Sequence, residues 1–118
     1  MTHIKHAQHP DEFWTLVADQ FRVLSEPLRV RILYVLKSGE KSVGEVVEAV
    51  KAHQPTVSKQ LKALHEAEFI ARRQEGTTVF YRIEDPMVFQ LCELVCSGLE
   101  ARIRRTAAAR LQLLGMRG

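Results

Sequence analysis

The stretch that decides the fold is Ser42–Ala67, SVGEVVEAVKAHQPTVSKQLKALHEA. Its apolar residues recur every three or four positions on either side of a break, which predicts two short helices joined by a tight turn. Pro55 suits the first turn of the second helix, because proline's missing N–H is not needed there. That helix places Val57, Leu61 and Leu64 on one face, so its polar residues are left for the other face.

The polar face of this second helix carries hydroxyls, amides and lysines, and no acidic residue occurs from Ala49 to His65. Such side chains pair with phosphate oxygens and with base edges in the major groove of DNA. The alternative is a core helix whose polar face is only solvated. The candidate DNA-binding residues of this helix are Gln54, Thr56, Ser58, Lys59, Gln60 and Lys62.

Two further helices are predicted before this stretch. Pro10 opens the first, which runs to Leu24 and is more apolar than a surface helix needs, so we expect it to pack on two partners. The second begins at Pro27, and its arginines, Arg29 and Arg31, are expected to face solvent.

A β-hairpin is predicted beyond the helix pair, where the period changes from helical to alternating. Residues 70–73 and 78–83 are rich in β-branched and aromatic residues, and four residues separate them. Arg72, Arg73 and Arg82 make this hairpin basic. A basic hairpin after such a helix is typical of a wing that reaches the phosphate backbone or the minor groove.

A long last helix is predicted from Pro86 to about Leu114. Its apolar residues form two stripes, which indicates one contact with its own domain and one with a partner chain. The predicted fold is therefore mostly α with a small β-hairpin: a winged helix-turn-helix that dimerises through its first and last helices. We expect residues 1–10 to be a flexible tail and residues 11–114 to form one DNA-binding and dimerisation domain.

Composition agrees with a nucleic-acid-binding protein but does not require one. The chain has 118 residues, a net charge of +3 and 46% hydrophobic residues, enough for one core. The N-terminus lacks the apolar run of a signal peptide, and no stretch reaches the length of a membrane span. We therefore expect a cytoplasmic protein with no membrane partner. No acid–base pair, nucleophile motif or phosphate-cradling glycine loop occurs, so we do not predict an enzyme.

Cys92 and Cys96 lie four residues apart, on the same face of the predicted last helix. Their thiolates could bind one soft metal or metalloid ion, with a further ligand from the partner chain or from His3, His6 or His9. They could equally be small core residues, since free cysteine is often buried. Two thiolates are too few for tetrahedral zinc, so a thiophilic ion is the only cofactor that we consider.

Three segments together resemble the arsenic-repressor/metallothionein-repressor (ArsR/SmtB) family. They are LSEPLRVRILYVL (24–36), SVGEVVEAVKAHQPTVSKQLKALHEAEFI (42–70) and ARRQEGTTVFYRI (71–83). The resemblance extends from about Phe13 into the last helix. It implies a dimeric repressor that leaves its DNA operator when a metal ion, an oxidant or a sulfur species binds or reacts. It also implies base-reading roles for Gln54, Thr56, Ser58, Lys59 and Gln60, and wing contacts from Arg72, Arg73 and Thr77.

The chain departs from the family pattern in two places. Glu68 stands where glycine is common at the end of the recognition helix, and a left-handed cap there would cost on the order of 1 kcal/mol. The metal-sensing motifs are also incomplete. Residues 43–50 hold no cysteine, and although Asp85 is present, the later ligand positions of the last-helix zinc pattern hold Met87, Gly98 and Ala101.

Neither standard metal site of the family is therefore carried over to this chain. We favour a homodimeric repressor released from its operator by a soft metal or metalloid bound at Cys92 and Cys96. The alternatives are a repressor that senses thiol redox state or reactive sulfur, and a winged-helix protein-interaction module.

Overall fold

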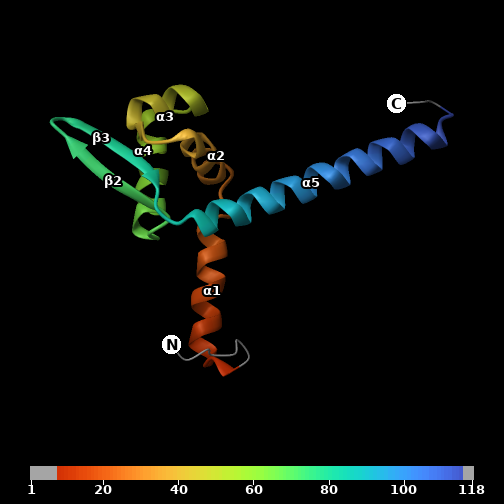
Figure 1. Cartoon of the computed structure of the whole chain (residues 1–118), viewed down its shortest axis with the longest axis horizontal. Coiled ribbons are helices and arrows are strands. Elements are labelled where there is room, and N and C mark those ends of the chain that lie inside the picture. Colours follow the sequence, from red (N-terminus) through yellow and green to blue (C-terminus); the bar gives the residue numbers. More distant parts are fainter. Residues whose placement is uncertain (1–7, 116–118) are drawn as a thin grey trace. The chain divides into compact units, whose positions relative to one another are not determined.

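A computed structural model describes residues 8–115 of the chain (Figure 1). The chain divides into two compact units, Met1–Asp85 and Pro86–Gly118, which we describe separately. In order, the elements are α1 (Asp11–Val23), α2 (Pro27–Val35), the short 3-10 helix η2 (Leu36–Ser38), β1 (Lys41–Ser42), α3 (Val43–Val50), α4 (Gln54–Glu66), β2 (Ile70–Glu75), β3 (Thr78–Ile83) and α5 (Pro86–Leu113). The predicted class, mostly helical with a small β-hairpin, is confirmed.

The core of the first unit lies between α2, α3, α4 and the base of the hairpin. The buried apolar residues include Ile32 and Leu33 of α2 and Val46 of α3. In α4 the buried apolar residues are Val57, Leu61 and Leu64. The spacing of three and four residues therefore identified the packed side of α4 correctly.

Local capping sets where α3 begins and ends. The Ser42 hydroxyl accepts from the Glu45 amide at 3.1 Å, and the Glu45 carboxylate accepts from the Ser42 amide at 2.9 Å. This reciprocal pair satisfies two N–H groups that the first helical turn would leave without partners. At the other end, Lys51 is left-handed with φ +52°. The turn before α4 therefore begins at Lys51, which adopts a left-handed conformation that residues with a side chain rarely adopt.

A three-stranded antiparallel sheet with the order β1-β3-β2 forms the wing. Ile70 pairs with Ile83 at its base and Glu75 pairs with Thr78 at its tip. β2 therefore extends two residues further than predicted, β3 has the predicted bounds, and the turn is only two residues long. Gly76 has φ +61° in that turn, a conformation that glycine adopts at low cost. The sequence signal missed the tip because its strand residues are charged or polar. It also missed β1, which is only two residues long.

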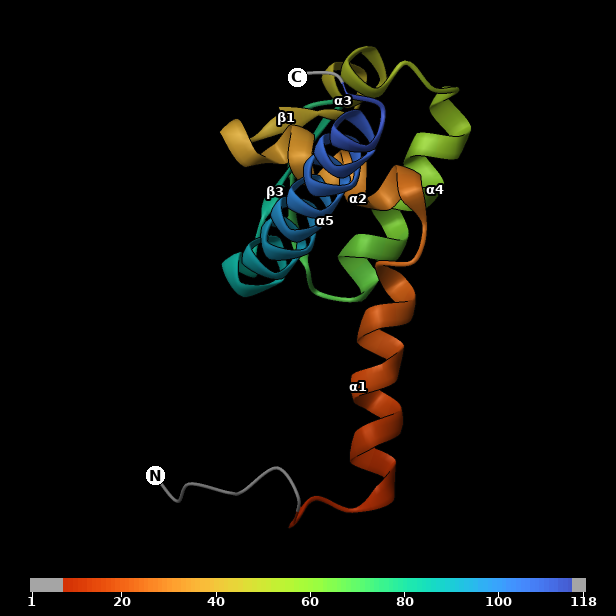
Figure 2. The same ribbon diagram turned by 90° about the vertical axis from the view of Figure 1, so that its right-hand side faces the viewer.

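Helix α1 presents apolar side chains that its own chain does not cover. Figures 1 and 2 show α1 extending away from the α2–α4 bundle. Within the described chain, none of its residues is buried, and Trp14, Leu16 and Phe21 are exposed. The rest of the first unit therefore leaves these side chains of α1 exposed, and the packing of α1 on two partners stays a prediction.

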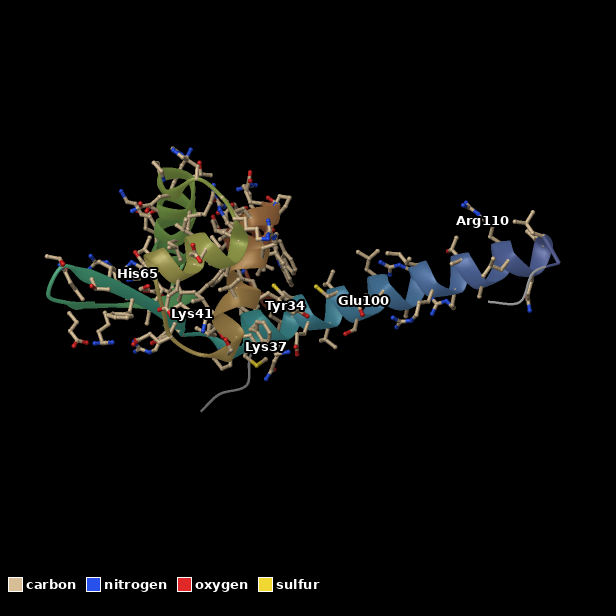
Figure 3. All side chains as sticks on the ribbon, turned by 90° about the horizontal axis from the view of Figure 1, so that it is seen from above. Tyr34, Lys37, Lys41, His65, Glu100 and Arg110 are labelled. Atoms are coloured by element: carbon tan, nitrogen blue, oxygen red, sulfur yellow. The ribbon has the colours of Figure 1, made fainter. Side chains whose placement is uncertain are left out.

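The second unit contains the single long helix α5, whose bounds agree with the prediction to within one residue. Cys92 is its only buried residue. Large apolar side chains are exposed along it, namely Met87, Leu94, Val95, Leu99, Ile103 and Leu113. Figure 3 shows Glu100 and Arg110 projecting from the middle and the distal part of this helix. Among residues 8–115, no helix is long and apolar enough to cross a membrane.

Candidate nucleic-acid interface

The outer face of α4 is a continuous polar surface. Five of the six side chains predicted from the sequence to contact DNA are exposed: Gln54, Thr56, Ser58, Lys59 and Lys62. No acidic residue lies in the first turn, and Pro55 occupies its expected place there. The amide groups of that turn and the partial positive charge of the helix start both favour an anion such as a phosphate group.

Gln60 differs from the other candidates because it is buried, with only 9% of its surface exposed. Its Oε1 accepts a hydrogen bond of 2.6 Å from Nε of Arg29 in α2. Position 60 follows Val57 by three residues and precedes Leu64 by four, so it lies on the core side of α4. We therefore leave Gln60 out of the contact surface. Its side chain forms a hydrogen bond with Arg29 inside the first unit.

Of the two arginines of α2, Arg31 is exposed as expected and Arg29 is not. Arg29 is half-buried, and besides Gln60 it contacts the carbonyl oxygen of Val23 through Nη1 at 3.2 Å. Arg31 donates through Nη2 to the carbonyl oxygen of Val50 at 3.0 Å, at the end of α3. Both side chains bend back onto neighbouring helices. Helical periodicity places a Cα on the outside of a helix, but it does not show where a long side chain ends.

On the wing, Arg73 is held by two carboxylates. Its guanidinium lies 2.7 Å from a Glu40 carboxylate oxygen and 2.6 Å from Glu75, and it stacks on the Phe80 ring at 4.5 Å. The hydrogen bond to Arg73 lowers the pKa of Glu40, and both carboxylates raise the pKa of Arg73. This arginine therefore joins β2 to the loop before β1, and its charge is largely matched within the wing.

Arg72 lies on the other face of the hairpin, opposite Tyr81 in the register. It is exposed, and its hydrogen bond to Gln74 is long, at 3.4 Å. Thr77 is exposed in the turn at the tip of the wing. Arg82 lies 3.8 Å from Glu84, a weak surface pair. Arg72 is therefore the wing arginine best placed to meet a phosphate group.

The cysteines of α5 are both reduced, Cys92 buried and Cys96 half-buried. Burial, and then the charge of the nearby Cys96, raise the pKa of Cys92 above that of a free thiol. Among the described residues, no three His, Cys, Asp or Glu side chains gather where they could hold a metal ion. His9 stacks on Phe13 at 3.7 Å between ring centroids, and His3 and His6 lie outside the described residues.

The chain is similar to known proteins over α2, α3, α4 and the start of β2. A family model described as "Bacterial regulatory protein, arsR family" matches residues 26–72. The HTH-type transcriptional regulator KmtR of Mycobacterium tuberculosis is 42% identical over 82 residues, which are 70% of this chain and 63% of that relative. The biofilm growth-associated repressor of Agrobacterium fabrum is 37% identical over 79 residues, which are 67% of this chain and 68% of the relative. The chain belongs to the ArsR family.

Solved structures of ArsR-like repressors share the fold of this ArsR-family chain. The antimony-specific transcriptional repressor AntR has a TM-score of 0.73 at 26% identity, over 88% of this chain and 99% of that one. The homodimeric winged helix-turn-helix DNA-binding domain Mb0332 of Mycobacterium bovis has a TM-score of 0.70 at 28% identity, over 85% and 91%. The ArsR family consists of transcriptional regulators rather than enzymes, as predicted. The chain spans less than two thirds of the length of KmtR.

Proposed function

We propose that this ArsR-family protein is a homodimeric repressor. In this proposal α4 contacts the bases of a DNA operator, and the wing contacts the phosphate backbone of the DNA. The observation that carries the proposal is the outer face of α4, where exposed amide, hydroxyl and ammonium groups occur and no carboxylate lies between Gln54 and His65. Lys59 and Lys62 supply salt-dependent attraction to phosphates, while Gln54, Thr56 and Ser58 offer hydrogen bonds to base edges.

The proposed dimer is supported by apolar side chains that are exposed on α1 and on α5. Trp14, Leu16 and Phe21 are exposed on α1, and Leu99 and Ile103 are exposed on α5. A second copy would bury these side chains and would set two copies of α4 at a fixed distance, as two DNA half-sites require. The similar domain Mb0332 of Mycobacterium bovis is homodimeric, which supports the proposed dimer.

The effector that we propose is a soft metal or metalloid ion bound by Cys92 and Cys96. Spacing of four residues places both sulfurs on one side of α5, and thiolates are the ligands that such ions prefer. The described residues supply only these two thiols, so a third ligand would come from the partner chain or from His3, His6 or His9. The antimony specificity of the structurally similar AntR supports a metalloid.

Selection of DNA from a random-sequence pool tests the DNA-reading function. We expect the purified protein to enrich one sequence with two related halves, and to bind it more tightly than a shuffled duplex at about 150 mM salt. Lys59→Ala with Lys62→Ala should weaken binding to both duplexes and reduce its salt dependence. Failure to enrich any sequence would contradict the proposal. Unchanged retention of this double variant on heparin would favour the protein-interaction module instead.

Single cysteine variants test the effector. Cys92→Ser and Cys96→Ser should keep the affinity for the selected duplex, but antimonite or cadmium should no longer release them. In the unaltered protein the same titration should produce the absorption band of a metal–thiolate bond. If both variants still respond, the cysteines are packing residues.

Thiol chemistry without a metal is the second candidate for the effector. The pair of free cysteines on one helix favours it equally. Hydrogen peroxide or a persulfide donor would then release the duplex in the presence of a chelator, and a reductant would restore binding. Release by antimonite or cadmium alone, with no response to either of these reagents, would exclude it.

A further inference from the structure

One arginine joins three helices of the first unit. The guanidinium of Arg29 in α2 donates through Nε to Oε1 of Gln60 in α4, at 2.6 Å. Through Nη1 it donates to the carbonyl oxygen of Val23, the last residue of α1, at 3.2 Å. Carbonyl groups in the last turn of a helix have no partner within the helix, so this second bond satisfies one of them.

Gln60 is the only buried polar side chain among the described residues. It lies next to Lys59 in the sequence, so its side chain and the DNA-facing side chains belong to the same turns of α4. The other inward contacts of α4 are made by Val57, Leu61 and Leu64, and apolar contacts are not directional. A hydrogen bond weakens steeply when its angle changes. The bond to Arg29 therefore specifies the rotation of α4 about its own axis in a way that packing alone does not.

Rotation of α4 would also leave a buried amide oxygen without a partner. That loss is more costly than the bond is worth when it is made, because the group is removed from water. Wrong rotations of α4 are therefore penalised.

We propose that Arg29 is a positioning residue for DNA reading, which holds α4 at the rotation that presents Thr56, Ser58 and Lys59 outward. The inference rests on the proposed DNA-reading function. It predicts that the preference for the selected duplex over a shuffled one depends on the pair Arg29–Gln60, although neither side chain touches DNA. Base edges require accurate placement of donors and acceptors, whereas phosphate attraction tolerates small shifts.

The test compares variants of the full-length protein for thermal unfolding and for affinity to the selected and the shuffled duplex. Arg29→Met and Gln60→Met should each lower the preference for the selected duplex about tenfold. Arg31→Met is the matched control, because it removes an arginine of the same helix whose bond goes to Val50 of α3 rather than to α4. It should lower affinity for both duplexes by a similar factor and leave the preference within about twofold.

The double variant Arg29→Met with Gln60→Met separates positioning from stability. Its melting temperature should recover part of the loss seen in the single variants, because the buried amide of Gln60 is gone, although the carbonyl group of Val23 still lacks its partner. Its preference for the selected duplex should stay low. A preference that recovers together with stability, or single variants that are folded and keep the preference, would overturn the inference.

Two further outcomes are informative. Arg29→Lys keeps the charge but lacks the planar fork, so its preference should lie between those of the unaltered protein and Arg29→Met. This variant and the double variant also keep the test decisive if Arg29→Met does not fold. If the unaltered protein enriches no duplex at all, the proposed function fails.

Discussion

At the residue scale, two side chains occupy backbone conformations that favour glycine. Lys51 has φ +52° at the end of α3, and Glu68 has φ +64° after α4. Glu68 stands where glycine is common in the family, and the structure confirms the left-handed conformation for which a steric cost was expected. Both positions flank α4, so the recognition helix is bounded by strained residues rather than by the glycines that would stabilise these turns.

Glu68→Gly should raise the free energy of unfolding by roughly 0.5–1 kcal/mol, because glycine adopts a left-handed conformation without steric cost. Urea denaturation followed by circular dichroism measures the change. Glu68→Ala is the control, since alanine also loses the carboxylate but keeps the steric cost, and it should give no such gain. Equal stability of the two variants would show that the backbone at this position is not strained.

The capping box at the start of α3 is the second residue-scale feature with a measurable effect. Ser42→Ala should lower the free energy of unfolding by about 1 kcal/mol, because the Glu45 amide loses its acceptor. Ser38→Ala is the control, since its hydroxyl makes only a long contact of 3.5 Å with a helix carbonyl. A similar loss in both variants would mean that the capping box contributes nothing particular.

The same box predicts a dependence on pH. Hydrogen bonds from the Ser42 amide and hydroxyl lower the pKa of Glu45 in the folded protein. The carboxylate therefore contributes stability above its ordinary pKa of 4.5, and this contribution is lost as the pH falls through the lowered value. Glu45→Gln, which removes the titrating carboxylate and keeps an oxygen that can accept from the Ser42 amide, should flatten the decline of stability between about pH 5 and pH 3. An unchanged decline would indicate that other carboxylates account for it.

At the element scale, the wing carries two adjacent arginines with different roles. Arg73 is matched by Glu40 and Glu75, whereas Arg72 makes only one long hydrogen bond. Alternation along a strand places neighbouring side chains on opposite faces of the hairpin, and the acidic partners lie on one face only. The sequence shows two arginines of the same charge, but of these two only Arg72 has a guanidinium group that is free of carboxylate partners among the described residues and can contact phosphate.

Arg72→Ala should weaken DNA binding about equally on all sequences and reduce the salt slope by about one, the signature of one lost phosphate contact. Arg73→Ala removes the same charge and should have a smaller effect on the salt slope. It should instead lower the melting temperature, because β2 loses its tie to Glu40. Fluorescence anisotropy over a range of salt concentrations measures both slopes. A larger slope change for Arg73→Ala would reverse the assignment.

At the scale of the whole molecule, the uncovered apolar side chains predict self-association. Leu99→Glu should convert the proposed dimer to a monomer, because Leu99 shares one apolar side of α5 with Cys96 and Ile103. The consequence should be loss of operator binding, since a monomer engages only one half-site. Sedimentation equilibrium measures the mass.

Leu94→Glu is the matched control for this experiment. Leu94 is also exposed, but a spacing of five residues from Leu99 places it on a different side of α5. It should remain dimeric with the same added charge. Dissociation of Leu94→Glu, with Leu99→Glu still dimeric, would place the interface on the other side of the helix.

The sequence by itself determined the order and extent of the helices and the buried face of α4. These features depend on contacts between residues three or four apart, and such spacing is visible in a single chain. It also identified five exposed residues of α4 as candidates for DNA contact. Turn chemistry and alternation located the hairpin but not its full length, because the strand tip is polar.

Only the tertiary structure decided which polar residues face outward. Gln60 was indistinguishable from Lys59 in the sequence, yet it lies on the core side of α4 and meets Arg29, 31 residues away. Arg73 was indistinguishable from Arg72 until Glu40, 33 residues away, was placed beside it. The partners of these long polar side chains lie more than 30 residues away, and the periodicity of the sequence does not predict such distant pairs. The reason is physical: a hydrogen bond or an ion pair depends on where two helices or strands meet in space.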